Sequence, residues 1–425
     1  MKSAVVALCI GLGSAMASCT LWATELGRDV ASLLDYARRN NPEYAAMRLE
    51  AEAAGERVYP AGALPDPVLR AELQNITNYN METGNSSGVN LLPSRVGSTK
   101  YTFMQPLPFW GKRDLKRDAA RAEADAAQGR AGASWAELAA RIKTAFAQYF
   151  YVAHSERLTR EVLGLVERLE KTAQVRYASG LTPQQDAIRA QVEQTRMRAE
   201  LVALEAEKRQ LQARLNGLLS RPASAPLAEP LALRPLPPPA RLDPAALAER
   251  LAAGNPQLLT EEARLRAAQK QRELTWRNRY PDFTLGVTPI QTRNSFNEWD
   301  LMLELNLPLQ QESRRSQERE AEAMLAAARA RREAAANQVL SELSEQLAGL
   351  EAAQRTEMLI GANLLPQAEL TFQSALAAYE TARVDFATLL DAQREISRAK
   401  QERLKAQAEA QMRLAEIERL LGGEL

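Results

Sequence analysis

The sequence has few of the residues that build metal sites, disulfides and aromatic cores. Its 425 residues include one histidine, His154, and two cysteines, Cys9 and Cys19, so we expect no disulfide and no metal site. Aromatic residues make up only 5% of the chain, which is low for a conventional globular core. The net charge is +1, which argues against binding to nucleic acid, because that requires a strongly basic surface.

Long apolar runs are also missing, apart from one at the N-terminus. Residues 4–17 are mostly apolar and end in small residues, a pattern typical of a secretory signal peptide. We expect residues 1–23 to be this peptide, cleaved after Ala17, after Ala23, or before Cys19, which would then be a lipid anchor. No other run approaches the roughly 18 apolar residues of a spanning helix. An exported protein of this kind is periplasmic, secreted or an outer-membrane β-protein.

Catalytic motifs are missing as well. The sequence contains no Gly-x-Ser-x-Gly motif, no phosphate-binding loop and no His-Glu-x-x-His motif. Carboxylates are abundant, but they alternate with arginines in helical stretches, which is typical of solvated ion pairs. We therefore expect neither an enzyme nor a cofactor, and we interpret His154 as an ordinary helix residue.

The abundant residues, Ala, Glu, Arg, Leu and Gln, suit long helices, and they are arranged in a repeat. Short motifs recur in the same order in both halves of the chain, which predicts two copies of a unit of roughly 200 residues. The matched positions are Asn41-Pro42 and Asn255-Pro256, Pro65-Asp66 and Pro281-Asp282, Leu107-Pro108 and Leu307-Pro308, and Tyr177 and Tyr379.

The first repeat is expected at residues 24–220 and the second at residues 245–425, with a linker at 221–244 that carries eight prolines. Apolar spacing of three and four predicts helices, and alternation predicts strands. The expected elements of the first repeat are a helix at 29–59 kinked at Asn41-Pro42, strands at 66–77 and 96–106, a long helix at 111–178, and a helix at 183–219 capped by Thr182. Those of the second repeat are a helix at 245–279, strands at 282–291 and 298–308, a long helix at 311–379 disturbed by Pro366, and a helix at 384–421.

The helix lengths predict how these elements pack. In each repeat the two shorter helices together are about as long as the long helix, which would extend about 100 Å at 1.5 Å per residue. Two short helices stacked end to end can therefore lie alongside one long helix. A set of unrelated antiparallel hairpins is the alternative.

The predicted strands have one apolar and one largely polar face. Such alternation over about ten residues is typical of transmembrane β-strands, although a soluble hairpin with one buried face gives the same pattern. Four strands cannot close a barrel, so strands that cross a membrane require an oligomer, and a trimer supplies twelve. The residues expected to face the membrane are Leu69, Leu73, Phe283, Leu285, Trp299, Leu301, Leu303 and Leu305.

The order of these motifs, over nearly all of the mature chain, resembles the TolC family of outer-membrane efflux proteins. The resemblance implies a mainly α fold with a small β part: long helical hairpins that form a periplasmic α-barrel, and four strands per chain in a 12-stranded barrel. It implies a homotrimer in outer-membrane lipid, a passive duct that works with a periplasmic adaptor protein and an RND-type inner-membrane pump.

The run Pro108-Phe109-Trp110-Gly111-Lys112-Arg113 is similar to the heavy-metal branch of the family, the CzcC- and CusC-like ducts. Export of heavy-metal cations is therefore the expected function. A drug or protein-export duct of the same family is one alternative. A soluble periplasmic coiled-coil adaptor or scaffold is an alternative of another class.

Two helix breaks are expected at the end of the molecule away from the strands, where the family has its periplasmic entrance. Asp391 falls where the family has an entrance-lining aspartate, and Thr388 replaces a second one. An aspartate favoured by the helix dipole at a helix start is the alternative interpretation of Asp391. The other entrance candidates are Asp385 and Asp186, and the adaptor-contact candidates are Gly180, Leu181, Thr182, Arg383 and Val384.

Overall fold

The structure is a computed structural model. The predicted signal peptide with Ala17, Cys19 and Ala23, and the adaptor candidate Leu181, lie outside the residues that the structure describes. The described residues are 26–77, 88–89, 91–180, 182–381 and 383–425.

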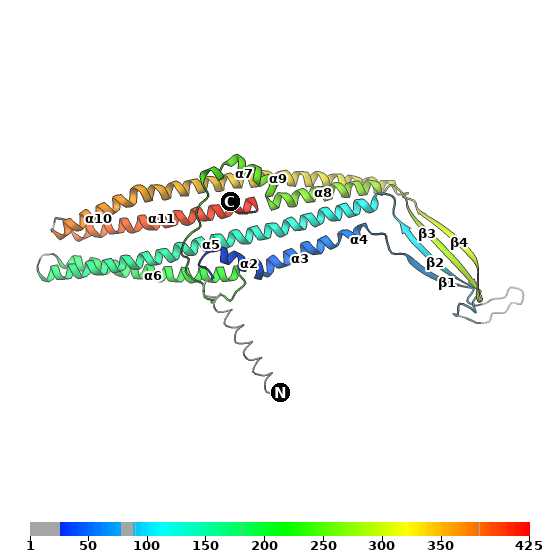
Figure 1. Ribbon diagram of the computed structural model, residues 1–425, viewed down its shortest axis with the longest axis horizontal. Helices are drawn as coiled ribbons and strands as arrows, with labels where there is room; N and C mark the ends of the chain where they lie inside the picture. Colours follow the sequence, from blue (N-terminus) through cyan, green and yellow to red (C-terminus); the bar gives the residue numbers. More distant parts are fainter. Residues whose placement is uncertain (1–25, 78–87, 90, 181, 382) are drawn as a thin grey trace, which may run out of the picture. The chain divides into compact units, whose positions relative to one another are not determined.

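Long helices and one small sheet make up the fold (Figure 1). The elements in chain order are α2 (Val30–Asn40), α3 (Pro42–Glu56), α4 (Val58–Gly62), β1 (Val68–Gln74), β2 (Ser98–Leu107), α5 (Lys112–Ala178), α6 (Gln184–Leu218), the 3-10 turn η1 (Pro239–Arg241), α7 (Pro244–Gly254), α8 (Pro256–Arg277), β3 (Asp282–Thr292), β4 (Ser295–Asn306), α9 (Gln311–Leu359), the π-helical turn η2 (Ile360–Leu364), α10 (Leu365–Glu380) and α11 (Phe386–Leu421).

The 67 residues of α5 form one uninterrupted helix. It contains no proline, is rich in alanine, and follows Gly111, whose φ of 80° suits a turn. The helix ends before Gly180, which has a φ of 70°. A left-handed glycine of this kind ends helices because it has no Cβ to clash.

The second long helix departs from the prediction. The segment expected as one helix at 311–379 is two α-helices, α9 and α10, joined by the π-helical turn at Ile360–Leu364. Pro366 follows this turn and has no backbone N–H, so the carbonyl four residues before it loses its helical partner. The wider π turn absorbs this disturbance without ending the helix.

The start of α6 also differs from the prediction. Thr182 was expected to cap this helix, but the N-cap position is Pro183, which makes no side-chain cap, and the helix begins at Gln184. Thr182 precedes a proline, which disfavours the helical region for its own backbone. It therefore lies one residue too early to cap.

The described chain divides into two compact units. Unit 1 comprises residues up to Arg48, Ala131–Pro256 and Ala336–Leu425, and unit 2 comprises Leu49–Arg130 and Gln257–Ala335. Each half of the sequence contributes to both units, because the long helices α5 and α9 pass from one to the other.

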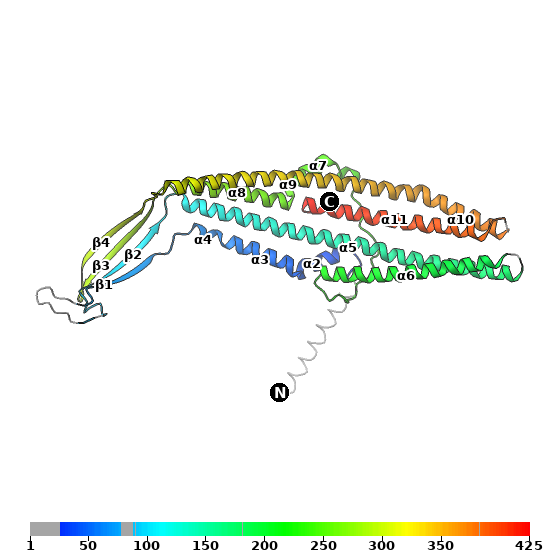
Figure 2. The same ribbon diagram turned by 180° about the vertical axis from the view of Figure 1, so that it is seen from behind.

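Unit 1 is a set of paired helices. The C-terminal part of α5 lies along α6, and α10 lies along α11 (Figures 1 and 2). A core between α2, α5 and α6 buries Leu33, Ile142, Tyr149 and Leu215 almost completely.

Equivalent buried asparagines join helix ends in the two halves of unit 1. The side-chain amide of Asn41, between α2 and α3, donates to the Leu218 carbonyl at the end of α6 at 2.9 Å. The amide of Asn255, between α7 and α8, donates to the Leu420 carbonyl at the end of α11 at 2.7 Å. Each contact brings the end of one short helix to the start of another, as the end-to-end stacking requires.

Unit 2 contains the sheet and the helix segments that lead into it. The four strands are antiparallel in the order β1-β2-β3-β4, so the pairing of β2 with β3 joins the two halves of the sequence. Strand β4 begins and ends a little earlier than the predicted 298–308, because the turn before it is tight, with Arg293 at a φ of 60°. In the helical part, Gly129 of α5 lies directly against Thr260 of α8.

Candidate functional surfaces: the sheet and the helix ends of unit 1

One face of the sheet is apolar and exposed. Leu301, Leu69 and Trp299 are 82%, 71% and 68% exposed. The strand register places all eight residues expected to face a membrane on this face, because Leu69 pairs with Phe103, Phe103 with Val287, and Val287 with Leu301. The other members are Leu73, Phe283, Leu285, Leu303 and Leu305.

The opposite face contains the more buried and more polar side chains. Thr102 and Thr288 are buried there and share a hydrogen bond of 3.0 Å between their hydroxyls. Lys100 forms an ion pair with Asp300 across the strands at 3.3 Å. A soluble sheet has the reverse arrangement, with the apolar face covered and the polar face in water. This sheet is therefore suited to apolar surroundings on its leucine-rich face.

The helix ends of unit 1 form the second candidate surface. The turn between α5 and α6 and the turn between α10 and α11 lie at the same end of this unit (Figure 2). A shared core of Leu169, Ala190, Tyr379, Phe386 and Leu389 holds them together. The structure thus brings together two helix breaks that lie about one repeat apart in the sequence.

Arg176 and Tyr379 connect the two turns. The Arg176 guanidinium lies 5.0 Å from the centre of the Tyr379 ring and donates to the Glu380 carbonyl at 3.1 Å. The Tyr379 ring contacts Phe386 at 5.4 Å. The Tyr379 hydroxyl is buried and has no hydrogen-bond partner among the described residues. This contact therefore depends on packing and a cation–π interaction rather than on the phenol group.

Asp186 is a buried carboxylate at the start of α6. Only 6% of its surface is exposed. Burial raises the pKa of this carboxyl, Arg189 opposes the shift, and the negative charge of Asp385 adds to it. The structure therefore brings two of the four entrance candidates close enough to interact.

Asp385 is the N-cap of α11. Its carboxylate accepts from the Thr388 backbone N–H at 3.0 Å and from the Thr388 hydroxyl at 2.6 Å. These hydrogen bonds lower the pKa of Asp385. Asp385 is thus also bonded to a third entrance candidate, Thr388, in a helix cap.

Asp391 lies in the second turn of α11, with 69% of its side chain exposed. The dipole interpretation therefore applies to Asp385, because the dipole effect is confined to the first turn. Arg394 donates to Asp391 at 2.9 Å and, through two nitrogens, to the buried Glu193 of α6 at 3.2 and 2.5 Å. The hydrogen bonds to Glu193 are the main cause that raises the pKa of Arg394, and burial opposes this shift. Arg394 is thus shared between an exposed and a buried carboxylate.

The adaptor-contact candidates lie in the two turns. Gly180 has open space around it, and Arg383 is exposed. Val384 is half-buried in the core of the helix ends. The Thr182 hydroxyl is buried and has no hydrogen-bond partner in the described chain. Arg383 and Gly180 are therefore the candidates most accessible to a partner.

Sequence patterns did not identify Arg176, Glu193 or Arg394. Tyr379 was recognised only as a repeat marker. The partners Glu193 and Arg394 are separated by 201 residues, so no local spacing connects them. The repeat itself could have placed α6 beside α11 and suggested a charge pair between them.

The described residues contain no group of three or more His, Cys, Asp or Glu side chains arranged to hold a metal ion. His154 is half-buried, stacks on Phe150 at 3.9 Å, and bonds to the Phe150 carbonyl at 3.0 Å. Burial is the main cause that lowers the pKa of its imidazole. None of the helices in the described ranges is both long and apolar enough to cross a bilayer.

Comparison with known proteins identifies a family. A family model described as outer membrane efflux protein matches residues 33–221 and 247–423. No curated protein sequence gives a significant match.

Solved structures share the fold. A membrane protein from Pseudomonas aeruginosa is 22% identical with a TM-score of 0.77, over 95% of this chain and 92% of its own. CusC is 19% identical with a TM-score of 0.78, over 95% and 94%. The outer membrane protein VceC from Vibrio cholerae is 17% identical with a TM-score of 0.76, over 93% and 96%. The fold class expected from the sequence, mainly α with a small β part, is confirmed.

Proposed function

The chain belongs to the outer membrane efflux protein family, and we propose that it forms the outer-membrane duct of a tripartite system that exports heavy-metal cations. Membership confirms the resemblance to the TolC family and identifies the chain as an efflux channel of the outer membrane rather than an enzyme. It also removes the soluble adaptor or scaffold as an alternative. The cargo, the partners and the roles of individual residues belong to the proposal.

The exposed apolar face of the sheet is the observation that supports the proposal most. If this face contacts lipid, strands β1 and β4 still have one unpaired edge each among the described strands. Bare N–H and C=O groups cost several kcal/mol each in lipid. Three copies of four strands give twelve, enough for a ring without edges. We therefore propose a homotrimer.

The trimer is tested by native mass spectrometry of protein purified in mild detergent. We expect a complex of three chains in the outer-membrane fraction. Trp299→Asp and Leu301→Asp, on the apolar face, should prevent membrane insertion, whereas Glu298→Gln, at the same end of β4 but on the opposite face, should not. A monomer that is soluble without detergent would contradict the proposal.

The helix ends of unit 1 are proposed as the periplasmic entrance and the adaptor-binding end. Three copies of Asp391 around the axis of a trimer would attract cations, as acidic rings do in channels. Arg394 next to Asp391 would weaken this field because it neutralises part of the charge. Arg383 and Gly180 would contact the adaptor, which links the duct to an RND-type pump.

The role of Asp391 is tested by ion selectivity of the trimer in planar bilayers. Asp391→Asn should lower the cation-to-anion permeability ratio, because it removes a negative charge. Arg394→Gln should raise this ratio, because it removes a positive charge at the same place. Glu320→Gln, an exposed carboxylate of unit 2, is the matched control. Equal selectivity in all four proteins would show that no acidic ring acts at this position.

Heavy-metal cations are the proposed cargo. The support is the run Pro108-Phe109-Trp110-Gly111-Lys112-Arg113, which resembles the metal-exporting branch of the family. A strain without the gene should lose tolerance to zinc, cobalt, cadmium, copper or silver and regain it with the wild-type gene. Loss of tolerance to drugs alone, or of a secreted protein from the medium, would replace metals with one of the alternative cargoes.

A further inference from the structure

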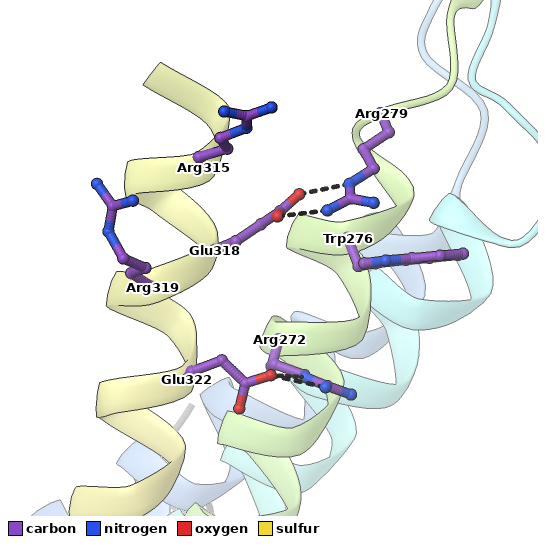
Figure 3. Close-up of a pocket in the computed structure, with 7 residues that line it drawn as sticks. All are labelled: Arg272, Trp276, Arg279, Arg315, Glu318, Arg319 and Glu322. Carbon is purple, nitrogen blue, oxygen red and sulfur yellow. Dashed lines mark hydrogen bonds and ion pairs between the residues drawn. The ribbon is translucent and has the colours of Figure 1, made fainter. Parts of the chain in front are cut away.

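A basic cleft lies between α8 and α9 in unit 2 (Figure 3). It has a volume of about 490 Å³ and is lined by four arginines, two glutamates and Trp276. Arg272 and Trp276 lie in the last turns of α8, Arg279 lies two residues after its end, and the other lining residues lie in the N-terminal part of α9. The arginines are Arg272, Arg279, Arg315 and Arg319.

The two glutamates of the cleft are already paired. Glu318 accepts two hydrogen bonds from Arg279, at 2.6 and 2.5 Å, and Glu322 accepts from Arg272 at 2.8 Å. Arg315 and Arg319 make no hydrogen bond or ion pair with the other residues drawn in Figure 3, and the Arg319 side chain turns to the side of α9 away from α8. With four arginines and two glutamates, the cleft has a net charge of +2. An anion can therefore bind to Arg315 and Arg319 without breaking an existing ion pair.

The cleft lies next to the strands in the sequence and in the fold. Strand β4 ends at Asn306 and α9 begins at Gln311. At 1.5 Å per residue, Arg315 and Arg319 follow the start of α9 by about 6 and 12 Å. The polar headgroup layer on each side of a bilayer is roughly 5–8 Å thick, and arginine side chains extend several ångströms toward it. Both arginines therefore lie in the part of α9 nearest the strands, where arginine side chains are suited to meet lipid phosphates if the sheet is in the membrane.

Aromatic contacts connect the cleft to the apolar face of the sheet. Trp276 meets Tyr280 edge-on at 6.0 Å, and Tyr280 stacks on Phe109 at 4.5 Å. The neighbouring Trp110, which is 75% exposed, contacts Phe283 on the apolar face at 5.9 Å. Exposed Trp and Tyr side chains are typical of the boundary between lipid and water. Contacts between aromatic side chains thus lead from the cleft to the leucine-rich face.

We propose that Arg315 and Arg319 bind the phosphate of an anionic phospholipid in the leaflet that faces the periplasm. Guanidinium groups form paired, charge-assisted hydrogen bonds with phosphate oxygens, and the acyl chains would continue onto the apolar face of the sheet. The inference rests on the proposed insertion of this sheet in the outer membrane. The other possible occupant is a carboxylate of a second copy of the chain.

The test is native mass spectrometry of the purified full-length protein titrated with phosphatidylglycerol. The double variant Arg315→Gln/Arg319→Gln should bind this lipid about tenfold more weakly, as expected when two charge-assisted contacts are lost. Arg329→Gln/Arg332→Gln, two exposed arginines further along α9, should bind like the wild type. Diacylglycerol, which has no phosphate, should bind all three proteins equally.

Three outcomes would overturn the lipid site. They are wild-type phosphatidylglycerol binding by Arg315→Gln/Arg319→Gln with the oligomer intact, an equal loss of binding in both double variants, and dissociation of the oligomer by Arg315→Gln/Arg319→Gln with lipid binding unchanged. The last outcome would show that the arginines pair with a second copy. Channel conductance in planar bilayers separates this test from the proposed function. A wild-type protein that conducts while its lipid binding is unaffected by the variants refutes only the lipid site, whereas one that does not insert refutes the function.

Discussion

Replacement of Glu418 by glutamine should loosen the proline-rich linker from the helices of unit 1. The Glu418 side chain is 4% exposed and lies 2.7 Å from the ammonium of Lys143, which is 7% exposed. Arg234 of the linker donates to both Glu418 oxygens, at 3.2 and 2.9 Å. In Glu418→Gln the two cations would stay in place without their buried counter-charge.

The expected cost is about 3 kcal/mol, at the lower end of the roughly 3–5 kcal/mol found when one member of a buried ion pair is removed. The lower end applies because Glu424, 3.4 Å from Lys143, can supply part of the missing charge. Burial by itself would raise the pKa of Glu418, but hydrogen bonds from Arg234 and Lys143 outweigh it and lower the pKa. This contribution is therefore complete above the ordinary Glu value of 4.5 and is lost as the pH falls through the lower folded pKa.

Hydrogen exchange measures the effect on the linker directly. The amides of Ala228 and Leu231 donate to backbone carbonyls near the start of α2, so they exchange only when the linker opens. If linker opening includes loss of the Glu418 contacts, a cost of about 3 kcal/mol corresponds to roughly 100-fold faster exchange at neutral pH. Glu424→Gln, whose carboxylate is 68% exposed, is the matched control and should change exchange less than about twofold. Equal exchange in Glu418→Gln and the wild type would refute this reasoning.

Three further variants test other contacts. Gly129→Val should destabilise unit 2 by about 2 kcal/mol or more because its side chain would collide with Thr260, whereas Gly55→Ala, in open space, should not destabilise it; both are measured by thermal unfolding in detergent. Asn255→Ala should cost about 1–3 kcal/mol, because it leaves the Leu420 carbonyl buried without its donor, and a similar effect of Asn41→Ala would support the equivalence of the two halves. Asp186→Asn should raise the midpoint of thermal unfolding at pH 7. Burial raises the pKa of Asp186, so the ionised side chain destabilises the folded state, and this destabilisation grows as the pH rises from the ordinary value of 3.8 through the folded pKa. A lower midpoint for Asp186→Asn at pH 7 than for the wild type would contradict this.

The sequence was sufficient to predict the long helix α5 and the alternating strands. In α5 the absence of proline and the spacing of Ile142, Phe146 and Tyr149 predict a continuous helix with a buried stripe, and these residues are in the core. In β4 the alternation of Trp299 and Leu301 with polar residues predicts one apolar face, and the pairing register shows it. Both are local patterns whose period reflects the geometry of the element.

Contacts between distant segments were not predictable in this way. The pairs Arg394–Glu193 and Arg176–Tyr379 join residues about one repeat apart, and no periodicity relates them. The prediction that Thr182 caps α6 was also wrong, because the proline that follows it shifts the first helical residue to Gln184. Capping rules require the exact position of the first helical residue, which the sequence alone does not define to within one residue.

The sheet makes assembly and membrane insertion interdependent in the proposed trimer. Strands β1 and β4 have 7 and 12 residues, and about half of these direct their N–H and C=O groups to the free edge. At several kcal/mol for each unsatisfied group in lipid, a single inserted chain would be destabilised by tens of kcal/mol. The leucine-rich face, in contrast, is unfavourable in water for as long as it is exposed. Neither a free monomer in the periplasm nor an inserted monomer is therefore favourable, and we expect edge pairing between copies to accompany insertion rather than to follow it.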